Sequence, residues 1–356
     1  MKLGKTSEIY RILKERLDGG VYQPGSKFPS CGRIAEEFGI NKMTANKIVS
    51  MLMGEGCLVR TGSNRTGIQV KDSLLQKARG TLAFLGRISP YVSLVLNGVV
   101  KETRNSDFLL LLESPDMADF HRRVQFLRRS GVSGVISISC GIPELPPDMR
   151  QVCIDIPNPP ENAPPNVYFI NSDNYQGGFN IMSEILRRGH REILIFSSER
   201  FARGLSLPVL PRVRGMQHAM MKSGISDAES RCFYAMPGSL SDARNFLRIY
   251  LEKYPETTVI AADSDGSAHL IAEAARTLGI SCPGSIALTG FGNITMLPIA
   301  TVDQNAEYQG QLAARKLIGM EQEERQFSAE DSRIELVETT LVKTDHIPIR
   351  LHPQSL

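Results

Sequence analysis

From Thr81 onward the chain alternates short apolar runs with longer segments of helical period, and this alternation restricts the fold more than any other feature. Strands that are apolar on both faces need helices on both sides, so the pattern predicts parallel sheets in an α/β fold. About 275 residues are too many for one modest open sheet, and we therefore expect two doubly wound lobes. The predicted strands are TLAFLG (81–86), FLLLLES (108–114), GVISIS (134–139), VCIDI (152–156), EILIFS (192–197), TVIAAD (258–263), SIALTG (285–290) and ATVD (300–303).

Residues 1–71 follow a different pattern, which begins with three helical segments. The first is an amphipathic helix over residues 6–17, and a turn-rich connection with two prolines follows it. Ser30 is a good N-cap for a short second helix that Gly39 ends, and Asn41 can cap the third. The inward stripe of the third helix is predicted to be Ala45, Ile48, Val49 and Leu52.

A two-stranded ribbon is predicted after the third helix, at Cys57–Arg60 and Ile68–Val70, around a turn that holds Arg65. Three helices followed by a ribbon with a basic tip form the layout of a winged helix-turn-helix domain. Residues 1–75 hold 12 Lys/Arg and 7 Asp/Glu, a net charge of +5, whereas the rest of the chain has a net charge of −2. This segregation points to a polyanion as the partner of residues 1–71, called the head below.

The head resembles the GntR family of regulators over about residues 6–71, in GGVYQPGSKFPS (19–30) and RIAEEFGINKMTANKIVSMLMGEGCLV (33–59). The resemblance implies double-stranded operator DNA as the partner. The arginine that the family often has shortly after its proline-serine pair falls on Gly32, so its neighbour Arg33 is the expected substitute. The residues expected to contact DNA are Ser30, Arg33, Lys42, Thr44, Asn46, Lys47, Arg65 and Gly67.

The rest of the chain, called the body, resembles the LacI/GalR effector domain over about residues 80–345. That domain is itself similar to periplasmic sugar-binding proteins. The resemblance implies a small-molecule effector between two lobes, and bodies that pair side by side into a homodimer. Four stretches carry it: FINSDNYQGGFNIMSEILRRGHREILIFSS (169–198), PRVRGMQHAMMKSGI (211–225), TVIAADSDGSAHLIAEAARTLGISCPGSIALTGFGN (258–293) and ATVDQNAEYQGQLAARKLI (300–318).

Positions that match this family give a candidate ligand site. Carboxylates, a guanidinium and an amide suit a polyhydroxylated ligand, because they can hydrogen-bond neighbouring hydroxyls in pairs. An aromatic ring can form an apolar wall against the face of a sugar. One position departs from the family, since its usual ligand-binding acid is replaced by Gly292. The residues expected to bind ligand are Tyr91, Asp155, Arg212, Asp265 and Gln304.

Several function classes are disfavoured by what the sequence lacks. It has no GxxxxGK[ST] phosphate-binding loop and no GxSxG nucleophile motif, and Gly290-Phe-Gly292 is not followed by a third glycine. The six cysteines form no CxxC pair and the histidines no HExxH, so we expect no metal and no cofactor. No apolar run reaches about 18 residues, and the first 17 residues lack the apolar region of a signal peptide. These features favour a cytoplasmic protein that is not an enzyme.

We interpret the sequence as a ligand-responsive transcriptional regulator, a sugar-sensing repressor, in which a ligand between the lobes changes the affinity for operator DNA. The alternatives left open are a periplasmic sugar-binding protein and, less favoured, a sugar- or nucleotide-processing enzyme. The expected boundaries are the head at 1–71, a linker at 72–79, and the body at 80–356, with lobe 1 at 80–171 and 304–330 and lobe 2 at 172–303 and 331–356.

Overall fold

The chain forms two compact units, Met1–Arg79 and Gly80–Leu356, each with hydrophobic clusters of its own. The first unit contains the head and the second is the body. The structure, a computed structural model, describes residues 5–23, 25–60, 67–71, 78–116, 118–156, 159–160, 162–198, 210–235, 238–323 and 333–350.

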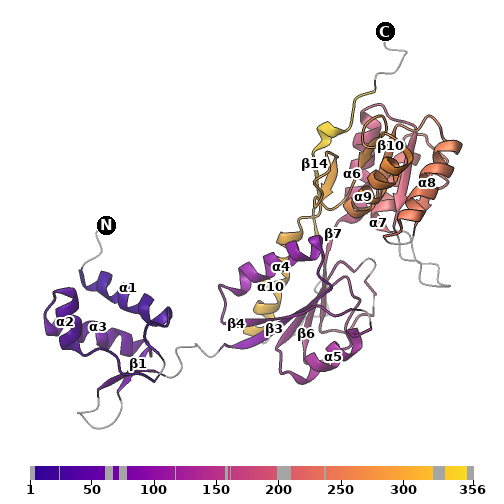
Figure 1. Ribbon diagram of the computed structural model, residues 1–356. Helices are drawn as coiled ribbons and strands as arrows, with labels where there is room; N and C mark the ends of the chain where they lie inside the picture. The colour runs from indigo at the N-terminus through magenta and orange to yellow at the C-terminus, as the bar shows by residue number, and fades with distance from the viewer. Residues whose placement is uncertain are drawn as a thin grey trace. The chain divides into compact units, whose positions relative to one another are not determined.

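The head is a three-helix domain with a two-stranded antiparallel ribbon (Figure 1). Local signals determine where its helices begin and end. The Ser30 hydroxyl accepts a hydrogen bond from the backbone N–H of Arg33, and the Asn41 side chain accepts one from Thr44. Gly39, with φ of 57°, ends the second helix. The elements are α1 (Lys5–Asp18), α2 (Cys31–Phe38), α3 (Lys42–Gly54), β1 (Leu58–Arg60) and β2 (Ile68–Val70).

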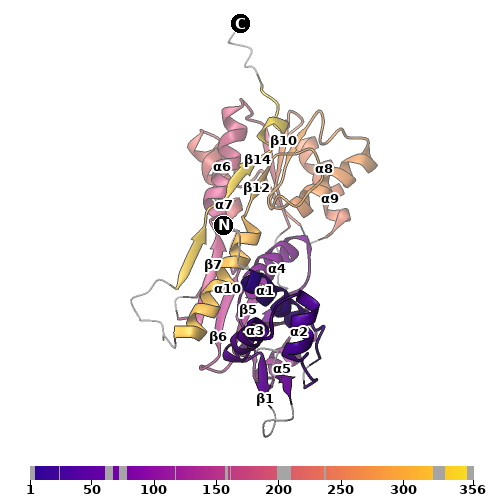
Figure 2. The ribbon, with the colours of Figure 1, turned by 90° about the vertical axis from the view of Figure 1, so that its left-hand side faces the viewer.

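Lobe 1 of the body has a six-stranded parallel sheet in the order β13-β7-β6-β5-β3-β4. Helices α4 and α10 cover one face side by side, and α5 packs on the other (Figures 1 and 2). Glycines let α4 and α10 approach closely, since a Cβ on Gly98 would lie 1.9 Å from the carbonyl oxygen of Glu307. The elements are β3 (Gly80–Leu85), α4 (Pro90–Thr103), β4 (Phe108–Glu113), α5 (Phe120–Arg129), β5 (Gly134–Ile138), β6 (Arg150–Ile154), β7 (Val167–Ser172), α10 (Ala306–Glu323) and β13 (Ile334–Val337).

Lobe 2 repeats this plan with a four-stranded parallel sheet in the order β11-β10-β8-β9. Helices α6 and α7 cover one face, and α8 and α9 cover the other. Again two helices cross at a glycine, since a Cβ on Gly178 of α6 would lie 1.9 Å from the carbonyl oxygen of Arg212. The elements are α6 (Asn174–Arg187), β8 (Ile193–Ser197), α7 (Pro211–Lys222), β9 (Cys232–Tyr234), α8 (Leu240–Lys253), β10 (Val259–Ala262), α9 (Asp265–Leu278) and β11 (Ala287–Thr289).

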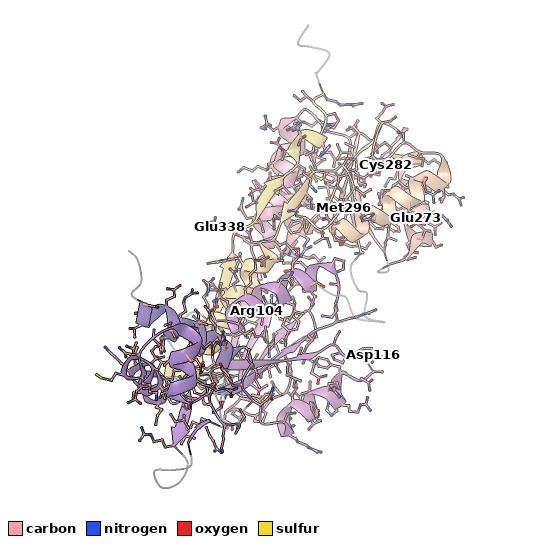
Figure 3. All side chains as sticks on the ribbon, turned by 60° about the vertical axis from the view of Figure 1, so that its left-hand side comes forward. Arg104, Asp116, Glu273, Cys282, Met296 and Glu338 are labelled. Atoms are coloured by element: carbon pink, nitrogen blue, oxygen red, sulfur yellow. The ribbon has the colours of Figure 1, made fainter. Side chains whose placement is uncertain are left out.

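Within the described residues, the chain passes between the lobes three times. The first crossover joins β7 to α6, and the second joins β12 (Thr301–Asp303) to α10. The third joins β13 to β14 (Thr340–Val342) and contains Glu338, which is labelled in Figure 3. Strands β12 and β14 pair antiparallel, and the Asn305 side chain donates to the carbonyl oxygen of Glu338 at 2.8 Å. The second and third crossovers are therefore bound to each other.

The fold class expected from the sequence is confirmed, but strands β7, β9, β13 and β14 were not predicted. Strand β13 also corrects a lobe boundary. It pairs with β7 in the sheet of lobe 1, so the chain returns to lobe 2 after Val337 and not at about residue 331. As an edge strand with Ile334 and Leu336 exposed, β13 has only one covered face and so lacks the continuous apolar run by which the central strands were recognised.

Candidate functional site

One face of α3 carries four of the residues expected to contact DNA. Lys42, Asn46 and Lys47 are exposed and Thr44 is half-buried. The opposite stripe of the helix is buried in the core of the head, as the spacing of its apolar residues predicts. The polar face is thus turned to solvent along a helix of 13 residues, a length that fits the major groove.

The basic residues of the head differ in whether they form ion pairs with acidic side chains. Three bases of α1 form ion pairs, and the pairs are Arg11–Glu15, Lys14–Glu55 and Arg16–Glu37. No ion pair within the described part of the chain involves Lys27, Arg33, Lys42 or Lys47. Lys5, Arg60 and Lys71 likewise form no ion pair within the described residues, so the start of α2 and α3 carry part of the uncompensated positive charge of the head, and phosphates can replace the missing partners there.

A hollow of ≈ 660 Å³ brings the start of α2 together with the ribbon. Ser30, Arg33, Lys27 and Gly67 all line it. Gly67 is exposed and has a φ of 89°, a backbone region that favours glycine. The structure thus gathers Ser30, Arg33 and Gly67 at one place in the head, whereas Arg65 lies outside the described residues.

Asp155 lies directly after β6, at the carboxyl edge of the sheet of lobe 1. Its φ is 57°, and Ser139, which follows the neighbouring strand β5, has a φ of 50°. The Ser139 hydroxyl donates to Oδ2 of Asp155 at 2.8 Å. The half-buried carboxylate is therefore held by one hydroxyl, and its remaining lone pairs can accept from a ligand.

Arg212 lies in the first turn of α7, after Pro211. Its Nη1 donates to the carbonyl oxygen of Asp263 at 3.0 Å, and its guanidinium carbon lies 4.3 Å from the centre of the Phe291 ring. Its Nε is buried and has no hydrogen-bond partner among the described residues, which also provide no carboxylate in ion-pair contact. The guanidinium is thus fixed by a ring and a carbonyl, with donors left for an anionic or hydroxylated group.

Tyr91, in the first turn of α4, shares the electrostatic environment of Asp155 and Arg212. Burial, followed by the negative charge of Asp155, raises the pKa of Tyr91 well above its usual range, while the Gln309 hydrogen bond and the charge of Arg212 act in the opposite direction. The phenol is therefore neutral at physiological pH. Tyr91 and Ser139 line a pocket of ≈ 460 Å³ in lobe 1, which also includes Asp116, labelled in Figure 3.

Gln304 lies in the second crossover and is only 4% exposed. Its Nε2 donates to Asn174 Oδ1 at 3.3 Å, and its carbonyl oxygen accepts from the Ser172 hydroxyl at 3.1 Å. Ser172 and Asn174 belong to the first crossover. Gln304 therefore connects two of the three chain segments between the lobes, in addition to its expected place beside the ligand.

Asp265 does not have the environment expected of a ligand-binding residue. It is 1% exposed, and its Oδ2 accepts from the backbone N–H groups of Ile294 and Thr295 at 2.6 and 3.1 Å. Its Oδ1 accepts from the Thr301 hydroxyl at 2.7 Å. With both oxygens occupied by protein donors, Asp265 holds the loop that contains Gly292, and its expected contact with a ligand stays a prediction.

Gln309 is a residue of this region that the sequence analysis missed. It is fully buried in α10, and its Nε2 lies within hydrogen-bond distance of the Tyr91 hydroxyl at 3.1 Å, the Ser172 hydroxyl at 2.9 Å and the Gln304 carbonyl at 2.8 Å. Its Oε1 is buried with no partner among the described residues. A glutamine on the inward face of a helix that otherwise buries apolar side chains is the signal that could have identified it.

No group of three or more His, Cys, Asp or Glu side chains among the described residues could hold a metal ion. None of the described helices is long and apolar enough to cross a membrane.

Comparison with known families matches each unit separately. The family model described as bacterial regulatory proteins, gntR family, matches residues 5–68, and that of the periplasmic binding protein-like domain matches residues 183–343. The chain is 25% identical over 344 residues to the arabinose metabolism transcriptional repressor of Geobacillus stearothermophilus, covering 89% of this chain and 92% of that protein. It is 34% identical over 90 residues to the HTH-type transcriptional repressor NagR of Bacillus subtilis strain 168, covering 24% of this chain and 37% of NagR.

Solved structures share the fold. A complex of the transcriptional regulator CelR with cellobiose has a TM-score of 0.61 and 18% identity, covering 88% of this chain and 98% of CelR. A LacI-family regulator from Enterococcus faecium with bound ribose has a TM-score of 0.59 and 18% identity, covering 73% of this chain and 96% of that protein. At this identity the likeness shows the fold alone.

Proposed function

We propose that this chain is a ligand-responsive DNA-binding regulator. It joins a GntR-type winged helix-turn-helix head to a LacI-like, periplasmic-binding-protein-like body. The head binds operator DNA, a small polar ligand binds between the lobes of the body, and the ligand changes the affinity for the operator. The combination of two separately folded units, one with uncompensated bases on α2 and α3 and one with polar groups at the lobe crossovers, is the observation that carries this proposal.

The DNA-binding role rests on the face of α3 and on the hollow beside it. Lys42 and Lys47 are exposed without ion-pair partners in the described chain, and Asn46 between them can read a base edge. Ser30 and Arg33, at the start of α2, are proposed to contact the phosphate backbone. Arg65 and Gly67 are proposed to contact an adjacent groove or phosphates from the wing.

The ligand is proposed to be a sugar or a sugar derivative. Asp155 and Arg212 offer an acceptor and a donor of opposite charge from the two lobes, and Tyr91 offers a ring beside them. Gln304 is proposed to join them from the second crossover. A repressor of arabinose metabolism is a relative over most of the chain, and structures of similar fold contain cellobiose and ribose. These relatives support a carbohydrate as the first class to test.

The body is proposed to form a homodimer that fixes the spacing of two heads. Strand β4 lies at the edge of the lobe 1 sheet, and its Leu109 and Leu112 are 60% and 48% exposed. An edge strand with exposed leucines favours association with another copy. A ligand that binds one arrangement of the lobes more tightly would then change the spacing of the heads. We further propose that the protein works in the cytoplasm, where its DNA is, and that it has no enzymatic activity.

Selection of DNA duplexes from a random library by the full chain tests the first half of this proposal. We expect a two-fold symmetric operator, with an affinity that falls steeply as salt rises, by a log–log slope of about −0.9 per phosphate contact. A thermal-shift screen over neutral sugars and sugar acids tests the second half. No selected duplex would contradict DNA binding, whereas selection without any stabilising sugar would contradict the carbohydrate ligand alone. A periplasmic sugar-binding protein would be stabilised by a sugar but would select no duplex.

A further inference from the structure

Helix α3 exposes a large apolar side chain on the same face as its lysines. Met43 is 84% exposed, more than any other large apolar side chain described in the head. It follows Lys42 in the first turn of the helix and precedes Lys47 by one turn. Each of these two lysines lacks an ion pair within the described part of the chain. Met43 therefore lies in the middle of the surface proposed to enter the major groove.

The chemistry of methionine restricts what this side chain can recognise on DNA. It has no hydrogen-bond donor, and its thioether sulfur is only a weak acceptor. It cannot read the donor and acceptor pattern by which most base edges are distinguished. The apolar group that the major groove displays is the C5-methyl of thymine. We propose that Met43 is a specificity-determining residue that contacts a thymine methyl group in each operator half-site, an inference that rests on the proposed DNA-binding function.

The neighbouring residues make this contact specific in position. Lys42 and Lys47 are long cationic side chains that can reach phosphates on either side of the groove and so fix the register of α3. The Asn41 cap fixes the first turn, because its side chain accepts from the backbone N–H of Thr44 at 2.7 Å. With the first turn fixed by the cap and the register by the two lysines, Met43 meets the same base pair in every half-site.

The test uses the full chain and its own selected operator. The wild type is expected to select a thymine at one position of each half-site, and replacing that thymine by uracil removes only the methyl group. We expect the replacement to weaken wild-type binding by about threefold to tenfold, as burial of one methyl group implies. In Met43→Ala the same replacement should have no effect, and a second selection with this variant should lose the thymine at that position alone.

Two further variants separate this contact from an effect on the helix. Met43→Gln keeps the length and helix propensity of the side chain and should also lose the response to uracil. Met51→Ala changes a half-exposed methionine eight residues later in α3 and should respond to uracil as the wild type does. The proposal is overturned if uracil has no effect on the wild type, if it affects Met43→Ala equally, or if Met51→Ala also loses the response. An operator without a selected thymine overturns it while leaving DNA binding intact, and failure to select any duplex overturns both.

Discussion

Replacing Arg212 by methionine should remove ligand binding while leaving the fold nearly unchanged. Methionine keeps much of the length of the side chain and its apolar contact with the Phe291 ring, but it cannot donate. The variant therefore removes the guanidinium that the structure leaves without a carboxylate partner among the described residues. We expect it to bind its operator as the wild type does in the absence of ligand, and to lose its response to ligand.

The contacts of Arg212 determine the size of both effects. The variant loses one hydrogen bond, from Nη1 to the Asp263 carbonyl, worth about 1 kcal/mol, and a cation–π contact worth about 0.5–1 kcal/mol. It also removes the buried Nε that lacks a partner, whose cost is about 1–3 kcal/mol. The free energy of unfolding should thus change by no more than about 1.5 kcal/mol in either direction. Loss of a buried charged partner should weaken ligand binding by roughly 2–5 kcal/mol, or about 30-fold to 4,000-fold in Kd.

Calorimetry with the sugar that gives the largest thermal shift on the wild type measures the ligand affinity, and chemical denaturation measures the free energy of unfolding. Arg214→Met is the matched control, since Arg214 is an exposed arginine two residues later in the same helix. Its ligand affinity should equal that of the wild type. Unchanged affinity in Arg212→Met would place the ligand site elsewhere, and a loss of several kcal/mol of stability would make Arg212 a structural residue.

Three further predictions concern charge, pH and packing. Lys47→Ala should weaken binding to all DNA sequences alike and make the log–log salt slope shallower by about 0.9, which anisotropy titrations at several salt concentrations measure; an unchanged slope would exclude a phosphate contact. Burial lowers the pKa of His190, whose ring nitrogens lie 2.9 Å from the Thr258 hydroxyl and 2.8 Å from the Pro348 carbonyl. The stabilising effect of neutral His190 should be present above about pH 6.5 and be lost as the pH falls. The difference in melting temperature between the wild type and His190→Asn should therefore be smaller at pH 5.5 than at pH 7.5. A difference that is the same at both pH values would contradict this. Gly178→Ala places a Cβ 1.9 Å from the Arg212 carbonyl oxygen and should destabilise the body by more than about 2 kcal/mol. Gly319→Ala lies in open space within α10 and should stabilise the body by about 0.5–1 kcal/mol. Similar melting temperatures for the two variants would refute the close helix crossing.

The sequence predicted best those parts of the fold that short-range signals specify. The caps Ser30 and Asn41 and the stop at Gly39 define α2 and α3 through contacts within a few residues. Most central strands of the body were visible because they are buried on both faces, but β7 was missed although all six of its residues are buried. Strand β9 has only three residues, and β13 is an edge strand with alternating exposure, so neither leaves a comparable pattern.

The candidate site shows the same difference between what local sequence specifies and what contacts between distant residues determine. Asp155 directly follows β6 and Arg212 lies in the first turn of α7, and both are half-buried, with hydrogen bonds to Ser139 and to the Asp263 carbonyl. Asp265 matched the pattern equally well, yet its carboxylate binds backbone groups about 30 residues further along the chain. Contacts between residues so far apart cannot be read from local spacing. The contacts of Gln309 were missed for the same reason, because they join α10 to α4 and to two crossovers.

These contacts of Gln309 join the Tyr91 side chain, proposed to contact the ligand, to two of the crossovers between the lobes. One amide nitrogen contacts the Tyr91 hydroxyl in the pocket, the Ser172 hydroxyl in the first crossover and the Gln304 carbonyl in the second. An amide nitrogen has two hydrogens for these three acceptors, and the buried Oε1 beside it has no partner in the described chain. Leaving such an acceptor unpaired costs about 1–3 kcal/mol, which a donor supplied by a ligand or by a rearranged neighbour would recover. A ligand that displaces the Tyr91 ring would change which acceptors the amide can reach, and with them the relative stability of the lobe arrangements. To shift the equilibrium between two lobe arrangements by about tenfold, a ligand must bind one of them more tightly by about 1.4 kcal/mol.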